Sequence, residues 1–376
     1  MNLRESPCGC PDGAPIAAPR ATADDAPLCA CPGRSHRGRA WAELLRLPAL
    51  FSVPGDALAG TAATGASPNS RTLLAIGSSL CLYEAGMALN DWADRDVDAV
   101  ERPHRPLPSG RIRPAAALTV ACALTGAGLA LAARAGRPAL AVAAPLAATV
   151  WAYDLGLKHT PAGPMVMGTA RGLDLLLGAA ATSGSTCPAL PSAALLGTHT
   201  LAVTTVSRQE AQGGSPLPPL AALATTAFLT RLVTRRSSGG PTTGRRPATG
   251  HWPATGHRLA TGHRLATGHR PANRPWSATG PRPAGLRADR FTGRDSGALL
   301  TTALGAAYAA TTARPYFHAT LNPSPPLTQR AVGAGIRATI PLQAALTARS
   351  RGTVTALLIA ALAPLGARFA KKVSVT

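Results

Sequence analysis

Long apolar runs recur along most of this sequence, and no other feature constrains its fold as strongly. The runs are 17 to 24 residues long, and an α-helix needs roughly 20 apolar residues to cross a bilayer. Because lipid offers no hydrogen-bond partners, a spanning segment must bond its own backbone, so the runs predict an all-α, polytopic membrane helix bundle. About nine spanning helices are expected, at residues 41–64, 72–92, 114–134, 138–157, 163–183, 189–206, 217–234, 297–313 and 352–369.

One further apolar run, residues 331–348, is harder to place. It contains Arg337 and Pro341, so a re-entrant or interfacial helix competes with a spanning one, and the sequence leaves both open. Aromatic residues make up only 4% of the chain, whereas Ala, Gly, Leu and Thr dominate the runs. Such small residues let neighbouring helices pack closely in lipid.

Polar segments rich in Arg, Pro and Gly divide the chain around these runs. They predict a disordered N-terminal tail at residues 1–39 and a low-complexity insert at residues 235–295. The first seven spanning helices then occupy residues 40–234, and the C-terminal ones occupy residues 296–376. The tail lacks the continuous apolar stretch of a secretory signal, so the first membrane helix is expected to stay in the mature protein.

The insert repeats a hexad, A-T-G-H-R-L and close variants, over residues 248–271. Its evenly spaced histidines suggest metal binding as one interpretation. The segment has too few large apolar residues to build a core, which favours a disordered linker instead.

The net charge of +21 raises nucleic acid as a partner, because clustered Lys and Arg neutralise phosphates. Here, however, the Arg residues lie between apolar runs. Their placement is better explained by the positive-inside bias of membrane proteins and by anionic lipid headgroups. We therefore expect a lipid bilayer, and no nucleic acid, as partner.

Basic residues also predict the orientation of the bundle. If the N-terminus is cytoplasmic, the connections after the second, fourth and sixth helices lie on one side, and they carry five Arg at residues 95–113, then Lys158 with His159, then Arg208. That face is expected to be the cytoplasmic face of the plasma (inner) membrane. With nine spans, the insert and Lys371/Lys372 fall on the opposite side, against the rule.

The most informative motif is N-D-W-A-D-R-D-V-D, which closes the second run. Its Asn90, Asp94 and Asp98 recur every four residues, and Asp91 lies three residues before Asp94, so all four project from nearly one helical face. Asp96 is expected to face solvent. Several carboxylates at the end of a membrane helix repel one another unless cations compensate. Hard oxygen ligands suit Mg²⁺, which also takes phosphate oxygens of a substrate.

A basic loop follows the acidic motif. Arg102 and Arg105, with His104 between them and three prolines nearby, place positive charge where an anion bridged by metal would sit. The competing interpretation is a solvated acidic helix end followed by an ordinary basic loop.

Together, N-D-x-x-D-x-x-x-D and R-P-x-R-P-x-P-S-G resemble the first signature of UbiA-type intramembrane prenyltransferases. L-L-R-L-P around Arg46, and Y-D-L-G-L-K with Tyr153 and Lys158, are similar in order, so the resemblance covers residues 41–234 well and 297–370 loosely. It implies that Asn90, Asp91, Asp94 and Asp98 hold Mg²⁺. It also implies that Arg46, Arg102, Arg105 and Lys158 contact a diphosphate.

The sequence departs from this family at the second acidic motif. Where D-x-x-x-D is usual after the sixth helix, the chain has S-R-Q-E-A-Q-G-G, with Glu210 as its one carboxylate beside Arg208. We expect Glu210 to contribute to metal binding and Arg208 to diphosphate binding, with the second metal site in question.

Four further ionisable residues fall inside the apolar runs: Asp56, Glu84, Arg171 and Asp174. Arg171 and Asp174 are three residues apart and are expected to pair. Glu84 lies seven residues before Asp91 on the same face, so it either reaches the acceptor or bonds a neighbouring helix. With Asp56 and Tyr153, Glu84 forms the candidate acceptor side.

The resemblance implies transfer of a polyprenyl group from an allylic diphosphate to a lipophilic or cyclic acceptor, with Mg²⁺ as cofactor. Two alternatives belong to other classes: a related protein that binds an isoprenoid lipid without transferring it, and a transporter whose intramembrane charges line a path.

Overall fold

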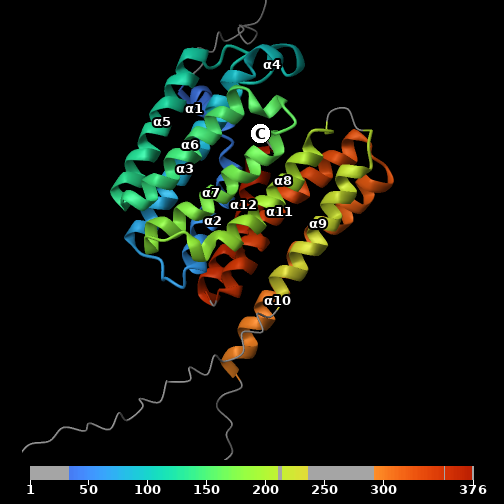
Figure 1. The fold of residues 1–376 in the computed structure, drawn as a ribbon. Coiled ribbons are helices and arrows are strands. Elements are labelled where there is room, and N and C mark those ends of the chain that lie inside the picture. The colour runs from blue at the N-terminus through green and yellow to red at the C-terminus, as the bar shows by residue number, and fades with distance from the viewer. Residues whose placement is uncertain (1–33, 211–213, 236–291, 351, 375–376) are drawn as a thin grey trace, which may run out of the picture.

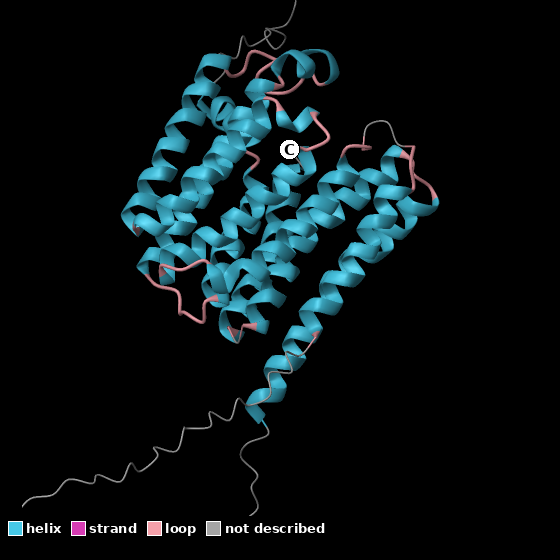
Figure 2. Ribbon diagram, viewed as in Figure 1, coloured by secondary structure: helices cyan, strands magenta, loops and turns pink. Residues whose placement is uncertain are grey.

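The computed structural model describes residues 34–210, 214–235, 292–350 and 352–374 (Figure 1). Within these ranges the regular structure is helical and includes no strand (Figure 2). The predicted all-α fold is therefore confirmed. Residues 1–33 of the predicted tail, and the hexad repeat with its histidines, lie outside the described residues.

Five of the described helices are long and apolar enough to cross a membrane, each coinciding with a predicted run. They are α3 (Ser70–Ala93), α5 (Pro114–Ala135), α6 (Arg137–Leu155), α8 (Leu190–Ser207) with the short η3 (Cys187–Ala189) before it, and α9 (Leu217–Thr234). Two more predicted runs form the long helices α7 (Gly163–Ser183) and α10 (Thr292–Leu321). The predicted number of nine spans is thus not confirmed by length and composition of the described helices.

The first predicted span is broken rather than continuous. It consists of α1 (Arg34–Leu44), the 3₁₀-helix η1 (Leu47–Ser52) and α2 (Val53–Ala63). Proline stands in the first turn of both η1 and α2, where its missing N–H is tolerated but where it cannot continue a preceding helix. The helical segment also begins at Arg34, inside the predicted tail.

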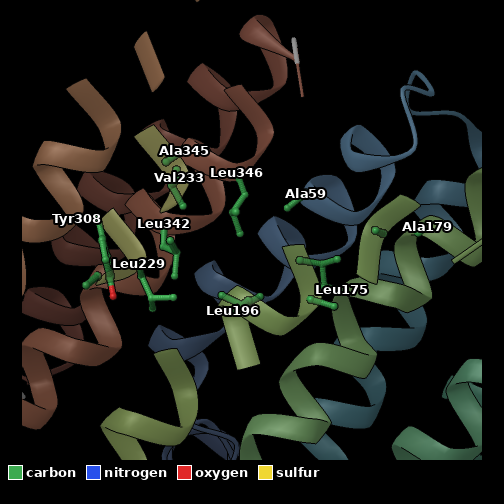
Figure 3. Close-up of a cluster of buried hydrophobic side chains, with 13 residues drawn as sticks. Ala59, Leu175, Ala179, Leu196, Leu229, Val233, Tyr308, Leu342, Ala345 and Leu346 are labelled. Carbon is green, nitrogen blue, oxygen red and sulfur yellow. The ribbon is translucent and has the colours of Figure 1, made fainter. Parts of the chain in front are cut away.

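The centre of the bundle is built from small and branched apolar residues. Leu175 of α7, Leu196 of α8, Leu229 of α9 and Leu342 of α11 (Pro325–Arg349) meet in one buried cluster, together with Tyr308 (Figure 3). A Cβ on Gly178 would collide with the backbone of Ala57, so α2 and α7 pack with almost no space between them. Small residues therefore set this close approach, as expected for helices in lipid.

The run that the sequence left open forms α11 (Pro325–Arg349), one continuous 25-residue helix with Pro341 in its interior. It packs against α2 and α8 on one side and between α10 and the last helix, α12 (Thr353–Ser374), on the other. Fifteen residues of α11 are buried within the bundle, which favours a helix inside the bundle over an interfacial one.

The direction of α12 corrects the predicted position of the C-terminus. Its start, at Gly352, lies beside Ala62 at the end of α2, whereas Gly366 lies against Phe51 of η1. The helix therefore returns toward the end of the bundle where η1 begins, and this is the end that carries α4 (Arg95–Glu101) (Figure 1). The additional helix α11 reverses the side predicted from nine spans.

Candidate functional site

The acidic motif lies where α3 meets α4, and it is not one continuous helix. α3 ends at Ala93, and Asp94, with φ −89° and ψ 2°, connects it to α4. The four predicted ligands therefore divide into two pairs on neighbouring flanks. Asp91 and Asp98 point to one group of basic residues, and Asn90 and Asp94 point to another. Asp96 is exposed, as predicted.

Asp91 and Asp98 share a single guanidinium nitrogen. Nη1 of Arg105 lies 2.6 Å from Oδ2 of Asp98 and 3.4 Å from Oδ1 of Asp91. Arg46 adds a contact of 3.3 Å to Asp91, and Arg102 one of 3.6 Å to Asp98. Both carboxylates are buried, so these cations compensate charges that water does not reach.

Asn90 and Asp94 contact the connection after α6. Nζ of Lys158, in the short η2 (Leu157–His159), lies 2.7 Å from Oδ1 of Asp94. The Nδ2 group of Asn90 donates a hydrogen bond of 3.1 Å to Oδ1 of Asp154. The motif after α3 and the motif after α6 are thus parts of one site.

Arg46 reaches this site through an unusual backbone conformation. It has φ 48° and ψ 45°, and it is the one non-glycine residue with positive φ among the residues described. The left-handed conformation destabilises an L-residue by about 1–2 kcal/mol. Strain of this kind persists where the surroundings impose it, and it is concentrated at functional sites.

Internal bonds hold the loop between α4 and α5. The backbone N–H of Ser109 donates to the carbonyl of Arg105, and the N–H of Ile112 donates to that of Pro106. Arg111 pairs with Glu43 of α1 at 2.7 Å. These contacts fix the backbone from which Arg102 and Arg105 reach the carboxylates.

The connection after α8 joins the same end of the bundle. The guanidinium of Arg208 donates to the carbonyl of Thr160, which follows Lys158 closely in sequence. Glu210 is half-buried, and burial raises the pKa of its carboxyl, while the positive charge of Arg102 opposes that shift. The predicted residues of all three connections are therefore brought together.

The candidate site residues at this end of the bundle are balanced in charge. The site contains five basic side chains and five carboxylates, namely Arg46, Arg102, Arg105, Lys158 and Arg208 with Asp91, Asp94, Asp98, Asp154 and Glu210. A polyanion finds no surplus positive charge here, so added cations are needed to hold one. Within the described ranges, no three His, Cys, Asp or Glu side chains converge in a ready metal site. The oxygen donors nevertheless fit Mg²⁺, since the space between Asp91 and Asp98 already holds a cationic group.

A second polar cluster lies deeper in the bundle. Arg171 pairs with Asp56 at 3.0 Å, and Gln343 donates a bond of 2.6 Å to the same carboxyl. Asp174 instead accepts from the hydroxyl of Ser79. The predicted pairing of Arg171 with Asp174 is therefore wrong, because Asp56 on α2 offers the closer carboxylate.

Glu84 differs from these residues. It is buried on α3 two turns below Asp91, and neither of its carboxylate oxygens has a hydrogen-bond partner among the described residues. Of the two predicted environments, bonding to a neighbouring helix is not observed.

Comparison with known proteins relates the part of the chain that holds this site to a family. Residues 50–234 match the model of the UbiA prenyltransferase family, and this range contains the acidic motif, Lys158 and Glu210. The chain carries a UbiA prenyltransferase domain. Together with its apolar helices, this makes it a multi-pass membrane protein.

Relatives of the UbiA domain include a digeranylgeranylglyceryl phosphate synthase from Methanothrix thermoacetophila, 37% identical over 40% of this chain and 57% of that protein. The 33 kDa chain of bacteriochlorophyll synthase from Rhodobacter capsulatus is 37% identical over 28% of this chain and 36% of that protein. The alignments thus span about half the length of these relatives or less. A UbiA homologue from Aeropyrum pernix has 18% identity, a TM-score of 0.47, and covers 77% of this chain and 96% of its own.

The sequence analysis missed one residue of the candidate site. Asp154 is buried and bonds Asn90, yet the same Y-D-L-G-L-K stretch singled out only its half-buried neighbour Tyr153 and Lys158. The position of Asp154 in the sequence could have identified it. A carboxylate in the last turn of an apolar helix opposes the helix dipole, so it requires compensation by a partner.

Proposed function

We propose that this protein is a Mg²⁺-dependent prenyltransferase, which transfers a polyprenyl group from an allylic diphosphate to a lipophilic or cyclic acceptor. The observation that carries the proposal is the equal number of cations and carboxylates among the ten candidate residues, which Arg46 and the connections after α3, α6 and α8 bring together. The charges of these ten residues cancel one another when the site is empty. When a metal–diphosphate complex binds, the carboxylates face the metal ion, and the guanidinium and ammonium groups face the phosphates.

Mg²⁺ would be held by Asn90, Asp91, Asp94 and Asp98, with Glu210 from the connection after α8. Arg46, Arg102, Arg105, Lys158 and Arg208 would bind the diphosphate oxygens. Bound Mg²⁺ supplies Lewis-acid stabilisation of the departing diphosphate. For the basic side chains to reach the phosphates, Arg105 turns from Asp91 and Asp98 toward the anion.

The reaction breaks the allylic C–O bond, and the electron pair leaves with the diphosphate. The allylic carbon then bonds to the acceptor, which loses a proton. Preformed positive groups stabilise the leaving charge best where water is excluded. Glu84 lies two turns below Asp91, and its carboxylate oxygens have no hydrogen-bond partner among the described residues. It is the first candidate to orient the acceptor or take its proton, and Tyr153 and Asp56 are the other candidates. Asp56 is less available because Arg171 and Gln343 already occupy it.

We also propose that the protein lies in the plasma membrane with this site facing the cytoplasm. Lys158, Arg102 and Arg105 share one end of the bundle, and α12 directs the C-terminus to that end as well. Both features agree with the positive-inside bias.

Purified protein tests the function with Mg²⁺ and prenyl diphosphates of several chain lengths. Release of diphosphate together with a prenylated acceptor is the expected result. A second candidate, an isoprenoid-binding protein without transfer, is favoured by the single carboxylate of the third connection. Saturable binding of prenyl diphosphate with no release of diphosphate, across all acceptors offered, would establish that candidate instead.

A further inference from the structure

An apolar groove lies on the face of α11 that points away from α2 and α8. Its floor is α11, its walls are α10 and α12, and Phe51 and Ser52 of η1 close one end. The groove encloses about 640 Å³, which is within the roughly 300–1,000 Å³ of ligand pockets. Its lining is mostly Ala, Ile, Leu, Gly and Pro, so it suits hydrocarbon.

Arg337 is the exception in this lining. Its side chain is exposed at the groove, and none of the lining residues is acidic. Within the part of the chain that the structure describes, no hydrogen bond or ion pair involves its guanidinium. A charged group at membrane depth is unfavourable unless it finds an anion or reaches the interface.

The position of Arg337 allows it to meet an interfacial anion. Arg337 is the thirteenth of the 25 residues of α11, a helix of ~37 Å. Helical side chains tilt toward the N-terminus, and a Cβ at Gly333 would be only 3.2 Å from Nη1 of Arg337. The guanidinium therefore lies about one turn nearer the end of the bundle that carries the acidic motif, and a glycine leaves space for it.

We propose that this groove binds an anionic phospholipid of the bilayer. Its phosphate pairs with Arg337, and an acyl chain lies along Ile336, Ile340 and Leu304. Guanidinium groups bind phosphate with two parallel hydrogen bonds, and basic pockets between membrane helices are suited to anionic headgroups. The lipid would neutralise a charge that has no partner among the described residues.

A single guanidinium favours a bilayer lipid over a prenyl diphosphate. A phosphodiester headgroup carries one negative charge, which one Arg can neutralise. The diphosphate site uses five basic residues, whereas the groove offers one. The occupant is therefore a phospholipid, and the substrate binds elsewhere.

Native mass spectrometry of the detergent-purified full chain tests the proposal, with dioleoylphosphatidylglycerol and dioleoylphosphatidylcholine titrated separately. Wild type should bind the first phosphatidylglycerol at least fivefold more tightly than phosphatidylcholine. Arg337→Gln should remove that preference. Arg330→Gln is the matched control, because Arg330 is exposed on the same helix but outside the groove, and it should retain the preference. Ala307→Leu, which fills the groove from α10, should weaken binding of both lipids.

Two results would overturn the proposal. One is an unchanged preference for phosphatidylglycerol in Arg337→Gln when that variant unfolds at the wild-type temperature. The other is one-for-one displacement of the bound phosphatidylglycerol by geranylgeranyl diphosphate, which would assign the groove to the substrate.

Discussion

Lys158 and Asp94 form an ion pair of 2.7 Å that joins two connections of the bundle. The Lys158 side chain is only 8% exposed. Removing one partner of a buried pair leaves the other charge uncompensated, which destabilises more than the pair itself stabilises. The end of α3 and the connection after α6 therefore act as one unit in any experiment on the acidic motif.

The first prediction concerns the motif itself. Asn90→Ala and Asp94→Ala should abolish Mg²⁺-dependent diphosphate release and binding, because both remove oxygen ligands, while membrane insertion persists. Asp96→Ala is the matched control, since Asp96 belongs to the same motif but is exposed and should keep near wild-type activity. Turnover and membrane fractionation are measured together. Full activity in both site variants would contradict the assignment.

A second prediction uses the left-handed backbone of Arg46. Arg46→Gly should relieve backbone strain of about 1 kcal/mol but also removes one of the two cations that compensate the buried Asp91. The two effects oppose each other, so we expect no gain in unfolding temperature, while diphosphate binding weakens roughly tenfold because a charged hydrogen bond is lost. Arg46→Lys keeps the charge and the strain, so it should bind better than the glycine variant without gaining stability. Calorimetric titration with Mg²⁺ and diphosphate measures the affinities, and thermal unfolding measures the stabilities. Wild-type affinity in Arg46→Gly would show that this guanidinium does not touch the anion.

The third prediction concerns Glu210 and pH. Burial raises the pKa of its carboxyl, so lowering the pH protonates Glu210 earlier than an ordinary glutamate and removes a metal ligand. The Mg²⁺ concentration for half-maximal activity should therefore rise as the pH falls through that raised pKa. Glu210→Gln should need more Mg²⁺ at neutral pH and lose this pH dependence. Identical Mg²⁺ midpoints for wild type and variant would mean that the third connection does not complete the site.

Arg208 in the same connection allows a separate test. Its guanidinium is exposed and bonds the carbonyl of Thr160, so it can turn to the diphosphate without leaving a buried charge behind. Arg208→Ala should weaken diphosphate binding even at saturating Mg²⁺, with little change in stability. An affinity equal to that of wild type at saturating Mg²⁺ would exclude direct contact.

The last prediction concerns the ion pair of Asp56 with Arg171. Asp56→Ala leaves Arg171 without its carboxylate, which should lower stability by about 3–5 kcal/mol. The double variant Asp56→Ala/Arg171→Leu removes both charges and should recover much of that loss. Thermal unfolding in detergent is the measurement. Equal unfolding temperatures for the single and double variants would show that Arg171 finds another partner.

Much of this protein follows from local sequence. Spanning helices are set by the length and polarity of each run, because a backbone in lipid must make all of its hydrogen bonds within its own helix. Five of the predicted runs form α3, α5, α6, α8 and α9. The candidate site residues are likewise predicted from the sequence, because carboxylates and arginines at helix ends require compensation wherever they fold, and their roles in binding stay predictions. Those predictions needed no knowledge of which helices pack against one another.

Only the tertiary structure decided which charges meet. Asp154 with Asn90, Arg171 with Asp56, and Asp94 with Lys158 are contacts between residues 64 to 115 positions apart, and helical periodicity carries no information about such pairs. The break at Arg46 and the burial of α11 also depend on packing. The proline-containing turn of η1, and a helix that contains Arg337, become stable only where neighbouring helices pack against them. Periodicity reports which face of a helix is apolar, whereas the partner of each face is fixed by the arrangement of the whole bundle.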